Sequence, residues 1–357
     1  MDPVTPSSLI DIARRVEDRL HGLLTVEEAR WSAFDEELAD PVAEVSRLIG
    51  SGGKRLRPAF CHWGFVGAGG DAESSVVLDA GAALELLHAF ALFHDDIMDG
   101  SLTRRGAPVT HEVFAERHRS RGGSGESRRF GEGIAILVGD LTFVYSDRLL
   151  SDAPKAAREI WHELRIELNI GQLLDLMGSA TVERRREKAE RICRYKSGKY
   201  TIERPLHLGA MLAAPGREAE LLPALSTYGL PLGDAFQMRD DVMGAFGDTE
   251  MTGKPVGDDL REGKPTPLMA IATERAERKG DRGALDVLSA VGRVILDDDQ
   301  VRRVQEVILA TGALDELEQV ISRLTDEAIG SLRSMPIDGS VKRELEELAH
   351  YVADRRT

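Results

Sequence analysis

The chain of 357 residues is 42% hydrophobic and 30% charged, which supplies a large buried core and excludes a mainly disordered protein. Lys and Arg number 46 against 61 Asp and Glu, a formal charge of -15, so the average field repels nucleic acid and anionic membrane surfaces. We therefore expect no nucleic-acid partner, and an anionic substrate needs a local basic patch.

Cysteine content and hydropathy indicate the compartment. Cys61 and Cys193 lie far apart without metal-ligand spacing, so neither a disulfide framework nor a zinc site is predicted. The first residues lack a basic start followed by an apolar run, and the most apolar segment, residues 80–96, is interrupted by Glu85 and His88. We expect a cytoplasmic protein with no integral membrane segment.

Helical periodicity extends almost throughout the chain. Typical series of apolar residues are Leu9, Ile12, Ala13 and Val16 near one end and Val301, Val304, Val307 and Ile308 near the other. Strand alternation is hard to find, and none of the breaks rich in Gly or Pro is long enough for an interdomain linker. The pattern predicts one all-α domain over residues 1–357, a single large helical bundle.

The first candidate binding segment is GGKRLRP, residues 52–58, at the expected start of a helix. Glycine permits close approach of the backbone, and Lys54 and Arg57 offer an ammonium and a bidentate guanidinium to a phosphate. The spacing of a P-loop is absent. A solvated run of charge is the alternative when this segment is considered alone.

The second candidate is the acidic end of the apolar helix, where His94-Asp95-Asp96 is followed by Asp99. Asp95 and Asp99 are four residues apart and project from one helical face, where their repulsion calls for a cation. Mg²⁺ takes such carboxylates together with phosphate oxygens. The alternative, an acidic helix end in solvent, is disfavoured because acids at a helix C-terminus oppose the macrodipole. Arg104 and Arg105 follow closely.

Residues 118–133, HRSRGGSGESRRFGEG, are rich in Gly, Ser and Arg. We expect a mobile surface loop in this segment. Its arginines could instead bind a phosphate, but no apolar frame holds them, which favours the solvated loop.

The next candidates flank Gly198 in KSGKYT, residues 196–201. A helix broken or kinked at Gly198 would turn Lys196 and Lys199 inward. Individually, lysines are more often surface residues.

A second acidic run, residues 234–244, contains Asp240 and Asp241, and GKPVGDDLREGKPT follows at 253–266 with Lys254 and Lys264. Two acid pairs on separate helices, each followed by cations, describe a cavity that binds a diphosphate through several Mg²⁺ ions. In contrast, Asp297 to Asp299 precede a periodic segment and are expected to cap a helix N-terminus.

Such a cavity suits ionisation chemistry. A diphosphate held by Mg²⁺ and cations is a good leaving group, because charge on its bridging oxygen is stabilised. The carbocation that remains needs a dry apolar pocket, for which the helix before Asp95 supplies Leu84, Leu87 and Leu92. No Ser/His/Asp triad or Cys/His pair stands out.

Five ordered motifs resemble the trans-isoprenyl diphosphate synthases, or polyprenyl synthetases: GGKRLRP, FHDDIMDGSLTRRG, KSGKYT, GDAFQMRDD and GKPVGDDLREGKPT. The resemblance covers most of the chain. It implies an all-α bundle of the isoprenoid-synthase type with a central apolar cavity, usually a homodimer. It also implies head-to-tail condensation of isopentenyl diphosphate with dimethylallyl, geranyl or farnesyl diphosphate, and Mg²⁺ as cofactor, about three ions with substrate bound.

The resemblance also implies roles for particular residues. Isopentenyl diphosphate would contact Lys54, Arg57, His88 and Arg105, and the allylic substrate would contact Arg104, Lys196, Ser197, Gln237, Lys254 and Lys264. The magnesium ligands would be Asp95, Asp99 and Asp240, and Arg104, Lys196 and Lys254 would join them in the catalytic group. His88 independently falls on the helical face of Asp95, although a satisfied buried histidine is the alternative.

One position departs from the family pattern. The fifth residue of the second acid motif, usually acidic, is Gly244. Asp241 or Asp248 is expected to supply an outer carboxylate instead, although Asp248 lies about 12 Å along the helix axis from Asp240. We expect activity to survive with reduced metal affinity or a shifted rate.

Product length is expected to depend on the residues beneath the first acid face, the bulky Phe90 and the small Ala91. In this family, one aromatic residue there and an uninterrupted acid motif resemble geranylgeranyl (C20) synthases, with farnesyl (C15) and longer products as alternatives. A terpene cyclase of related fold is a second enzyme hypothesis. It is disfavoured by GGKRLRP and by the pair of Arg104 and Arg105, because a cyclase has no second diphosphate to hold. A non-catalytic regulatory subunit is a further alternative, and Gly244 is the one feature of the sequence that favours it.

Overall fold

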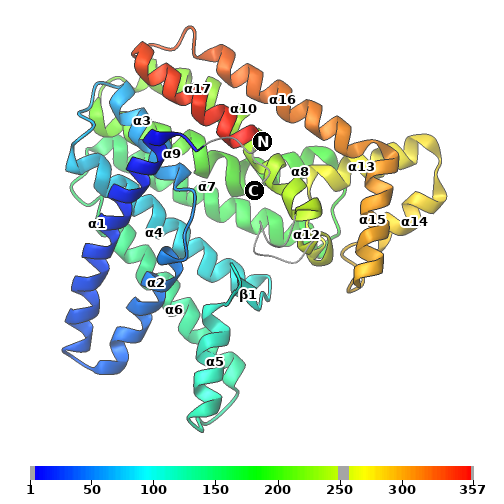
Figure 1. Ribbon diagram of the computed structural model, residues 1–357, viewed down its shortest axis with the longest axis horizontal. Helices are drawn as coiled ribbons and strands as arrows, with labels where there is room; N and C mark the ends of the chain where they lie inside the picture. Colours follow the sequence, from blue (N-terminus) through cyan, green and yellow to red (C-terminus); the bar gives the residue numbers. More distant parts are fainter. Residues whose placement is uncertain (1–4, 248–256, 355–357) are drawn as a thin grey trace.

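The computed structural model describes residues 5–247 and 257–354, and it confirms the predicted all-α fold (Figure 1). The first part of the chain forms α1 (Ser7–Ser32), the 3-10 helix η1 (Glu36–Leu38), α2 (Ala39–Gly50), α3 (Leu56–Gly67) and α4 (Ser75–Met98). A short antiparallel hairpin, β1 (Thr103–Arg104) and β2 (Ala107–Pro108), is the only sheet among the described residues.

The middle of the chain contains α5 (Thr110–Ser120), α6 (Ser127–Arg148), α7 (Lys155–Ala180), α8 (Arg186–Cys193), the π-helix η2 (Arg194–Glu203), α9 (Arg204–Ala213) and α10 (Glu218–Phe246). The last part contains α12 (Asp258–Glu262), α13 (Pro267–Lys279), α14 (Arg282–Ala290), α15 (Asp298–Thr311), α16 (Ala313–Ser331) and α17 (Gly339–Asp354).

Local sequence explains individual helices. The apolar series of α1 is buried as predicted, at Leu9, Ile12 and Val16. The predicted N-cap of α15 is confirmed, because the Asp297 side chain accepts from the Gln300 backbone N–H at 2.8 Å and the Gln300 side chain accepts from the Asp297 N–H at 2.9 Å.

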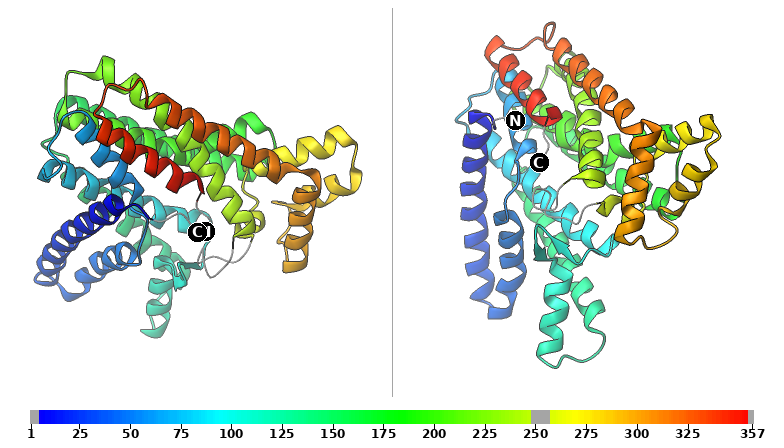
Figure 2. Two further views of the ribbon diagram at one scale, coloured as in Figure 1. Left: turned by 45° about the horizontal axis from the view of Figure 1, so that its top comes forward. Right: turned by 45° about the vertical axis from the view of Figure 1, so that its right-hand side comes forward.

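Two clusters of buried side chains form the core, and α10 contributes to both. The larger cluster includes Phe60, Trp161 and Tyr228, and the smaller one packs α8 and α12 to α16 around residues such as Met269. The helices α16 and α17 lie along one side of the molecule, and α5 projects from the body in every view (Figures 1 and 2).

Helix α4 is the most apolar helix and carries the first acid motif. By length and composition it is the one described helix that could cross a membrane, but 61% of its most apolar stretch is buried inside the fold. This burial is typical of a core helix, and it includes two charged residues of α4, Glu85 and Asp96.

The expectation of a loop at residues 118–133 is wrong in its extent. Only residues 121–126 are non-helical, because α5 continues to Ser120 and α6 begins at Ser127. An ion pair between Arg128 and Glu132, at 2.8 Å, supports the first turn of α6. A Cβ on Gly131 would collide with the carbonyl oxygen of His111. Glycine at this position therefore permits the close crossing of α5 and α6, and it does not mark a flexible loop.

The predicted helix break at Gly198 is a π-helical segment, η2. Gly198 crosses Gly233 of α10 backbone to backbone: a Cβ on Gly198 would lie 2.8 Å from the Gly233 carbonyl carbon. The wider i to i+5 turn places Lys196, Ser197 and Tyr200 together on the wall of one cavity. A π-bulge of this kind is frequent at functional sites.

Gly198→Ala is expected to destabilise the fold by about 1–3 kcal/mol, because the new methyl group overpacks the crossing of η2 and α10. Gly22→Ala is the matched control, since no atom lies within 4 Å of the Cβ position on this other helical glycine. Denaturant unfolding of both variants tests the expectation, and equal stability of the two would contradict it.

Candidate active site

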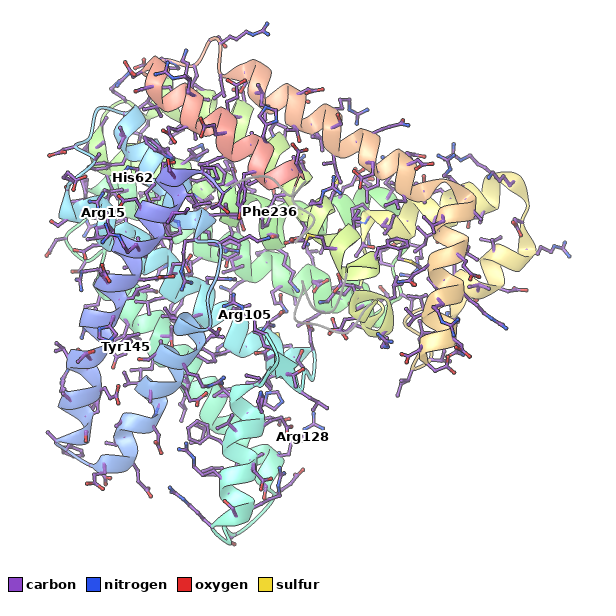
Figure 3. All side chains as sticks on the ribbon, viewed as in Figure 1. Arg15, His62, Arg105, Arg128, Tyr145 and Phe236 are labelled. Atoms are coloured by element: carbon purple, nitrogen blue, oxygen red, sulfur yellow. The ribbon has the colours of Figure 1, made fainter. Side chains whose placement is uncertain are left out.

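A cavity of about 560 Å³ opens among α3, α4, η2, α10 and α12. Most of the predicted site residues line it, namely Lys54, Arg57, His88, Ala91, Asp95, Arg105, Lys196, Ser197, Gln237, Asp240 and Lys264. Figure 3 shows Arg105 beside the hairpin and Phe236, another lining residue, on α10, both toward the middle of the molecule. Asp99, Arg104 and Phe90 are not on this wall, and Lys254 lies outside the described residues.

Arg104 is positioned by the hairpin over the first acid motif. Its Nε and Nη2 donate to Asp96 Oδ1 at 2.9 and 2.6 Å, and Nη2 lies 3.9 Å from Asp95. Asp96 therefore holds Arg104, while Asp95 one residue earlier faces the cavity.

Lysines from two other segments meet the first acid motif. Lys196 Nζ lies 3.2 Å from Asp95 Oδ1, and Lys264 Nζ lies 3.6 Å from Asp99 Oδ2. Burial and the neighbouring Asp95 raise the pKa of Asp99 to about 6. Burial also disfavours ionised Asp95, but Lys196, Lys264 and Arg104 outweigh it and hold the pKa of Asp95 below its usual value. Two carboxylates that repel each other in this way favour a bound cation.

The donor set of this cavity fits Mg²⁺. The described residues contain no group of three His, Cys, Asp or Glu side chains that would hold a metal ion by themselves. Mg²⁺ in proteins commonly uses one or two carboxylates and completes its shell with waters and phosphate oxygens. Asp95, Asp99 and Asp240 would hold the ions, which would stabilise negative charge on a departing diphosphate.

Both adjacent carboxylates of the second acid motif, Asp240 and Asp241, line the cavity. Asp241 is the more deeply buried of the two, and its side chain accepts from Gln237 Nε2 at 2.9 Å. Burial and the nearby Asp259 raise the pKa of Asp241 well above its usual value. Asp248 lies outside the described residues.

A second group of cations lies toward the start of α3. Arg57 donates to Thr201 Oγ1 at 3.0 Å, while its Nε is buried with no hydrogen-bond partner in the structure. Arg105 donates to Ser51 Oγ at 3.0 Å. With Lys54 also on the wall, this group offers donors to an anion.

Sequence reasoning missed the residue that holds this cationic segment in place. The Arg55 guanidinium is buried and donates to Glu85 at 2.6 Å, to the Ile49 carbonyl at 2.6 Å and to Glu17 at 3.1 Å. Arg55 also has a left-handed backbone, with φ of 48°. Only the three-dimensional pairing with Glu85 distinguishes Arg55 from its basic neighbours.

His88 is held by Tyr200, whose hydroxyl lies 2.6 Å from His88 Nδ1. Burial, followed by Arg57 and Arg105, lowers the pKa of His88 well below its usual value, and burial raises the pKa of Tyr200. Both groups are therefore neutral, and with the phenol as donor to Nδ1 the imidazole carries its hydrogen on Nε2. The ring can offer this N–H to an anion.

Tyr200→Phe is expected to raise KM for the substrate bound at His88 by about fivefold to tenfold, because one orienting hydrogen bond contributes about 1 kcal/mol. The low pKa keeps His88 neutral as pH falls, so His88 itself should contribute no inflection to KM near the ordinary histidine pKa of about 6.5, and the pH dependence of KM should be the same in Tyr200→Phe. Steady-state kinetics between pH 5.5 and 8 measure both effects; an unchanged KM in Tyr200→Phe would contradict the assigned role.

Two further polar residues on α7 were not predicted. Gln172 donates to Asp95 Oδ1 at 3.0 Å, and Asp175 Oδ2 lies 2.5 Å from Lys196 Nζ. Their spacing of three residues places them on one helical face beside the buried Leu168 and Gly171. A polar pair within a buried helical face was the signal that could have identified them.

Ala91 lines the cavity, and Phe90 does not. The Phe90 ring packs instead against Phe143 of α6, with centroids 4.8 Å apart, and against His94 at 4.7 Å. Adjacent helical residues point about 100° apart, so Phe90 and Ala91 do not share one wall. The role of Phe90 in chain length stays a prediction.

The all-helical fold surrounds a cavity with carboxylates, cations and an apolar wall, as prenyl transfer between diphosphates requires. Residues 40–307 match the polyprenyl synthetase family, and the chain belongs to this family.

Relatives of this chain include enzymes with products of different length. It is 31% identical over 318 residues to a geranylfarnesyl diphosphate synthase of Aeropyrum pernix, covering 86% of this chain and 92% of that protein. It is 29% identical to a (2E,6E)-farnesyl diphosphate synthase of Mycobacterium tuberculosis, covering 85% of this chain and 80% of that protein.

The fold is also similar to a solved structure of a geranylgeranyl pyrophosphate synthase from Corynebacterium glutamicum, complexed with isoprenyl diphosphate and magnesium. The TM-score is 0.89 at 39% identity, covering 96% of this chain and 98% of that chain. The family match and these similarities support the all-α fold and trans-prenyl diphosphate synthase activity. The names of the relatives do not agree on the chain length of the product.

Proposed function

We propose that this protein condenses isopentenyl diphosphate with allylic diphosphates and releases mainly geranylgeranyl diphosphate (C20). The observation that carries the proposal is the pair of cationic groups in one cavity. Lys196 and Lys264 stand beside the acid motifs, while Arg57 and Arg105 stand at the α3 end near His88. Two diphosphates can therefore bind together, as a condensation requires.

In the proposed reaction, Lys196 and Lys264 hold the allylic diphosphate beside the acid motifs with Mg²⁺. The carbon–oxygen bond breaks and the electron pair leaves with the diphosphate, so an allylic cation remains in the apolar part of the cavity. Arg57, Arg105 and the neutral His88 hold isopentenyl diphosphate, whose double bond attacks the cation. Loss of a proton to an oxygen of the released diphosphate restores a double bond.

The C20 assignment rests on the residues beneath the first acid motif. Ala91 leaves room on the cavity wall for a growing chain. The packed rings of Phe90 and Phe143 lie on the α6 side of α4 and limit growth in that direction. A farnesyl (C15) product would mean that the apolar space ends closer to Asp95.

A homodimer in the cytoplasm is part of this proposal. Exposed aliphatic side chains gather on α6 and α7, where Leu137 is 63% exposed and Ile170 is 46% exposed. A second copy of the chain would cover such side chains. Sedimentation should show a dimer, and a monomer at the concentration of the activity assay would contradict it.

The test is incubation of purified protein with Mg²⁺, labelled isopentenyl diphosphate and, separately, the C5, C10 and C15 allylic diphosphates. Chromatography of the products should show a dominant C20 chain from each starter, and chelation of the metal should abolish it. A dominant C15 or longer chain would overturn the length assignment alone. Folded protein that elongates no starter would contradict the condensation.

A further inference from the structure

The first half of η2 is fixed by two neighbouring helices. At the first residue of η2, Arg194 Nε donates to both carboxylate oxygens of Asp234 on α10, each at 3.2 Å. On another side, α7 crosses η2 so closely that a Cβ on Gly171 would lie 2.3 Å from the backbone nitrogen of Lys196. Lys196, which lines the cavity, is therefore held by contacts within this first half.

The second half of η2 is held by one carboxylate of α7. Glu167 Oε1 lies 2.5 Å from Lys199 Nζ, and the same carboxylate accepts from Arg204 Nε at 2.6 Å and from Arg204 Nη2 at 2.8 Å. In an α-helix, residues five apart point about 140° away from each other. The i to i+5 hydrogen bond of a π-helix closes a wider turn and brings such residues toward one side. The two partners of Glu167 therefore fit the π-helical form of η2 better than an α-helical one.

Glu203 joins these three side chains into a buried network, because it lies 3.4 Å from Lys199 and accepts from Ser226 of α10 at 2.6 Å. None of the four charged side chains is more than 15% exposed, and none lines the cavity. Burial disfavours ionised Glu167, but Arg204 and Lys199 outweigh it and hold the pKa of Glu167 below its usual value. Two carboxylates thus face two cations, and this balance of charge favours one arrangement of the segment.

The residues that directly follow Lys199 support the α3 end of the cavity. The Tyr200 hydroxyl lies 2.6 Å from His88 Nδ1, and the centroid of its ring lies 4.1 Å from Arg57 Cζ. Thr201 Oγ1 accepts from Arg57 Nη2 at 3.0 Å. The second half of η2 therefore determines where the His88 ring and the Arg57 guanidinium stand.

We propose that Glu167 is a positioning residue for isopentenyl diphosphate, because its pairing with Lys199 and Arg204 keeps the second half of η2 in its wide turn. The inference rests on the proposed function for the identity of the substrate at this end of the cavity. A turn that tightened toward α-helical spacing would rotate Tyr200 away from α4, and the groups that it supports would lose their orientation. Lys196 would stay in place, because the contacts of the first half do not involve Glu167.

Glu167→Gln, which preserves shape, is expected to raise KM for isopentenyl diphosphate by about 10- to 30-fold, since two orienting hydrogen bonds contribute about fivefold each. KM for the allylic starter should remain at the wild-type value. A second variant, K199M/E203Q, removes one charge of each sign, so the network stays neutral and the fold is preserved even if Glu167→Gln does not fold. It should raise the same KM and spare the other.

A double-mutant cycle with Tyr200→Phe separates positioning from a general loss of structure. Because Glu167 acts through Tyr200, the double variant E167Q/Y200F should have about the same KM for isopentenyl diphosphate as Glu167→Gln alone. A structural effect that is independent of Tyr200 would multiply with that of Tyr200→Phe instead. The matched control is E187Q/R191M, which removes an ion pair of the same spacing on α8, where the side chains are 82% and 54% exposed. It should leave both KM values unchanged.

Calorimetric titration with isopentenyl diphosphate alone measures its Kd in the same variants without turnover. Three results would overturn the inference: wild-type affinity in both folded variants, an equal rise in KM for both substrates, or multiplied effects in the double variant. Failure of the proposed function is a separate result, in which the wild-type protein binds isopentenyl diphosphate and elongates no starter.

Discussion

Asp95→Asn is expected to lower kcat/KM for condensation by about 10²- to 10³-fold, the usual cost of removing one group that stabilises charge in the transition state. Asp95 is where several elements converge. Its carboxylate lies 3.2 Å from Lys196 on η2, accepts from Gln172 on α7 at 3.0 Å and lies 3.9 Å from Arg104 of the hairpin. Loss of this charge removes a proposed metal ligand and an ion-pair partner of Lys196 in one change.

Asparagine preserves the shape of Asp95, so the fold should remain. Asp79→Asn is the matched control, because Asp79 belongs to the same helix but pairs with Arg19 on α1 and lies outside the cavity. Initial rates with labelled isopentenyl diphosphate, together with Tm values, compare the two variants. Activity of Asp95→Asn within a few-fold of the control would remove Asp95 from the metal site.

The helices and the main charged groups could be predicted because their causes are local. The burial of Leu9, Ile12 and Val16 follows from periodicity, and the N-cap at Asp297 follows from the residues beside it. Gly198 was recognised as a break from its own conformational freedom. Its long-range reason, the crossing with Gly233, appears only in three dimensions.

The missed residues depend on contacts between distant parts of the chain. Arg55 is indistinguishable in sequence from its basic neighbours, yet it is buried against Glu85, 30 positions away. Asp259 lies beside Gly244, where a Cβ would overlap its Oδ2, and this proximity depends on how α12 returns to α10. The composition of residues 118–133 is typical of loops, but it also permits the close helix crossing at Gly131, so composition alone predicts a loop that is too long.

Ala91→Phe is expected to shorten the main product from C20 to C15 or C10. Ala91 lines the cavity one helical turn before Asp95, about 6 Å along the axis. A phenylalanine at this position would fill space that a growing chain needs, while the acid motifs and both cationic groups stay in place. The first condensation should therefore proceed, and later ones should stop early.

Ala91→Ser is the matched control, because serine adds little volume and should leave the product distribution unchanged. Phe90→Ala tests the opposite direction: removal of the ring that packs on Phe143 should open space on the α6 side of α4 and lengthen the product. Chromatography of products from the C5 and C10 starters measures all three variants. A folded Ala91→Phe protein that still makes C20 would mean that the growing chain does not pass this wall, and the length assignment would have to rest on other residues of the cavity.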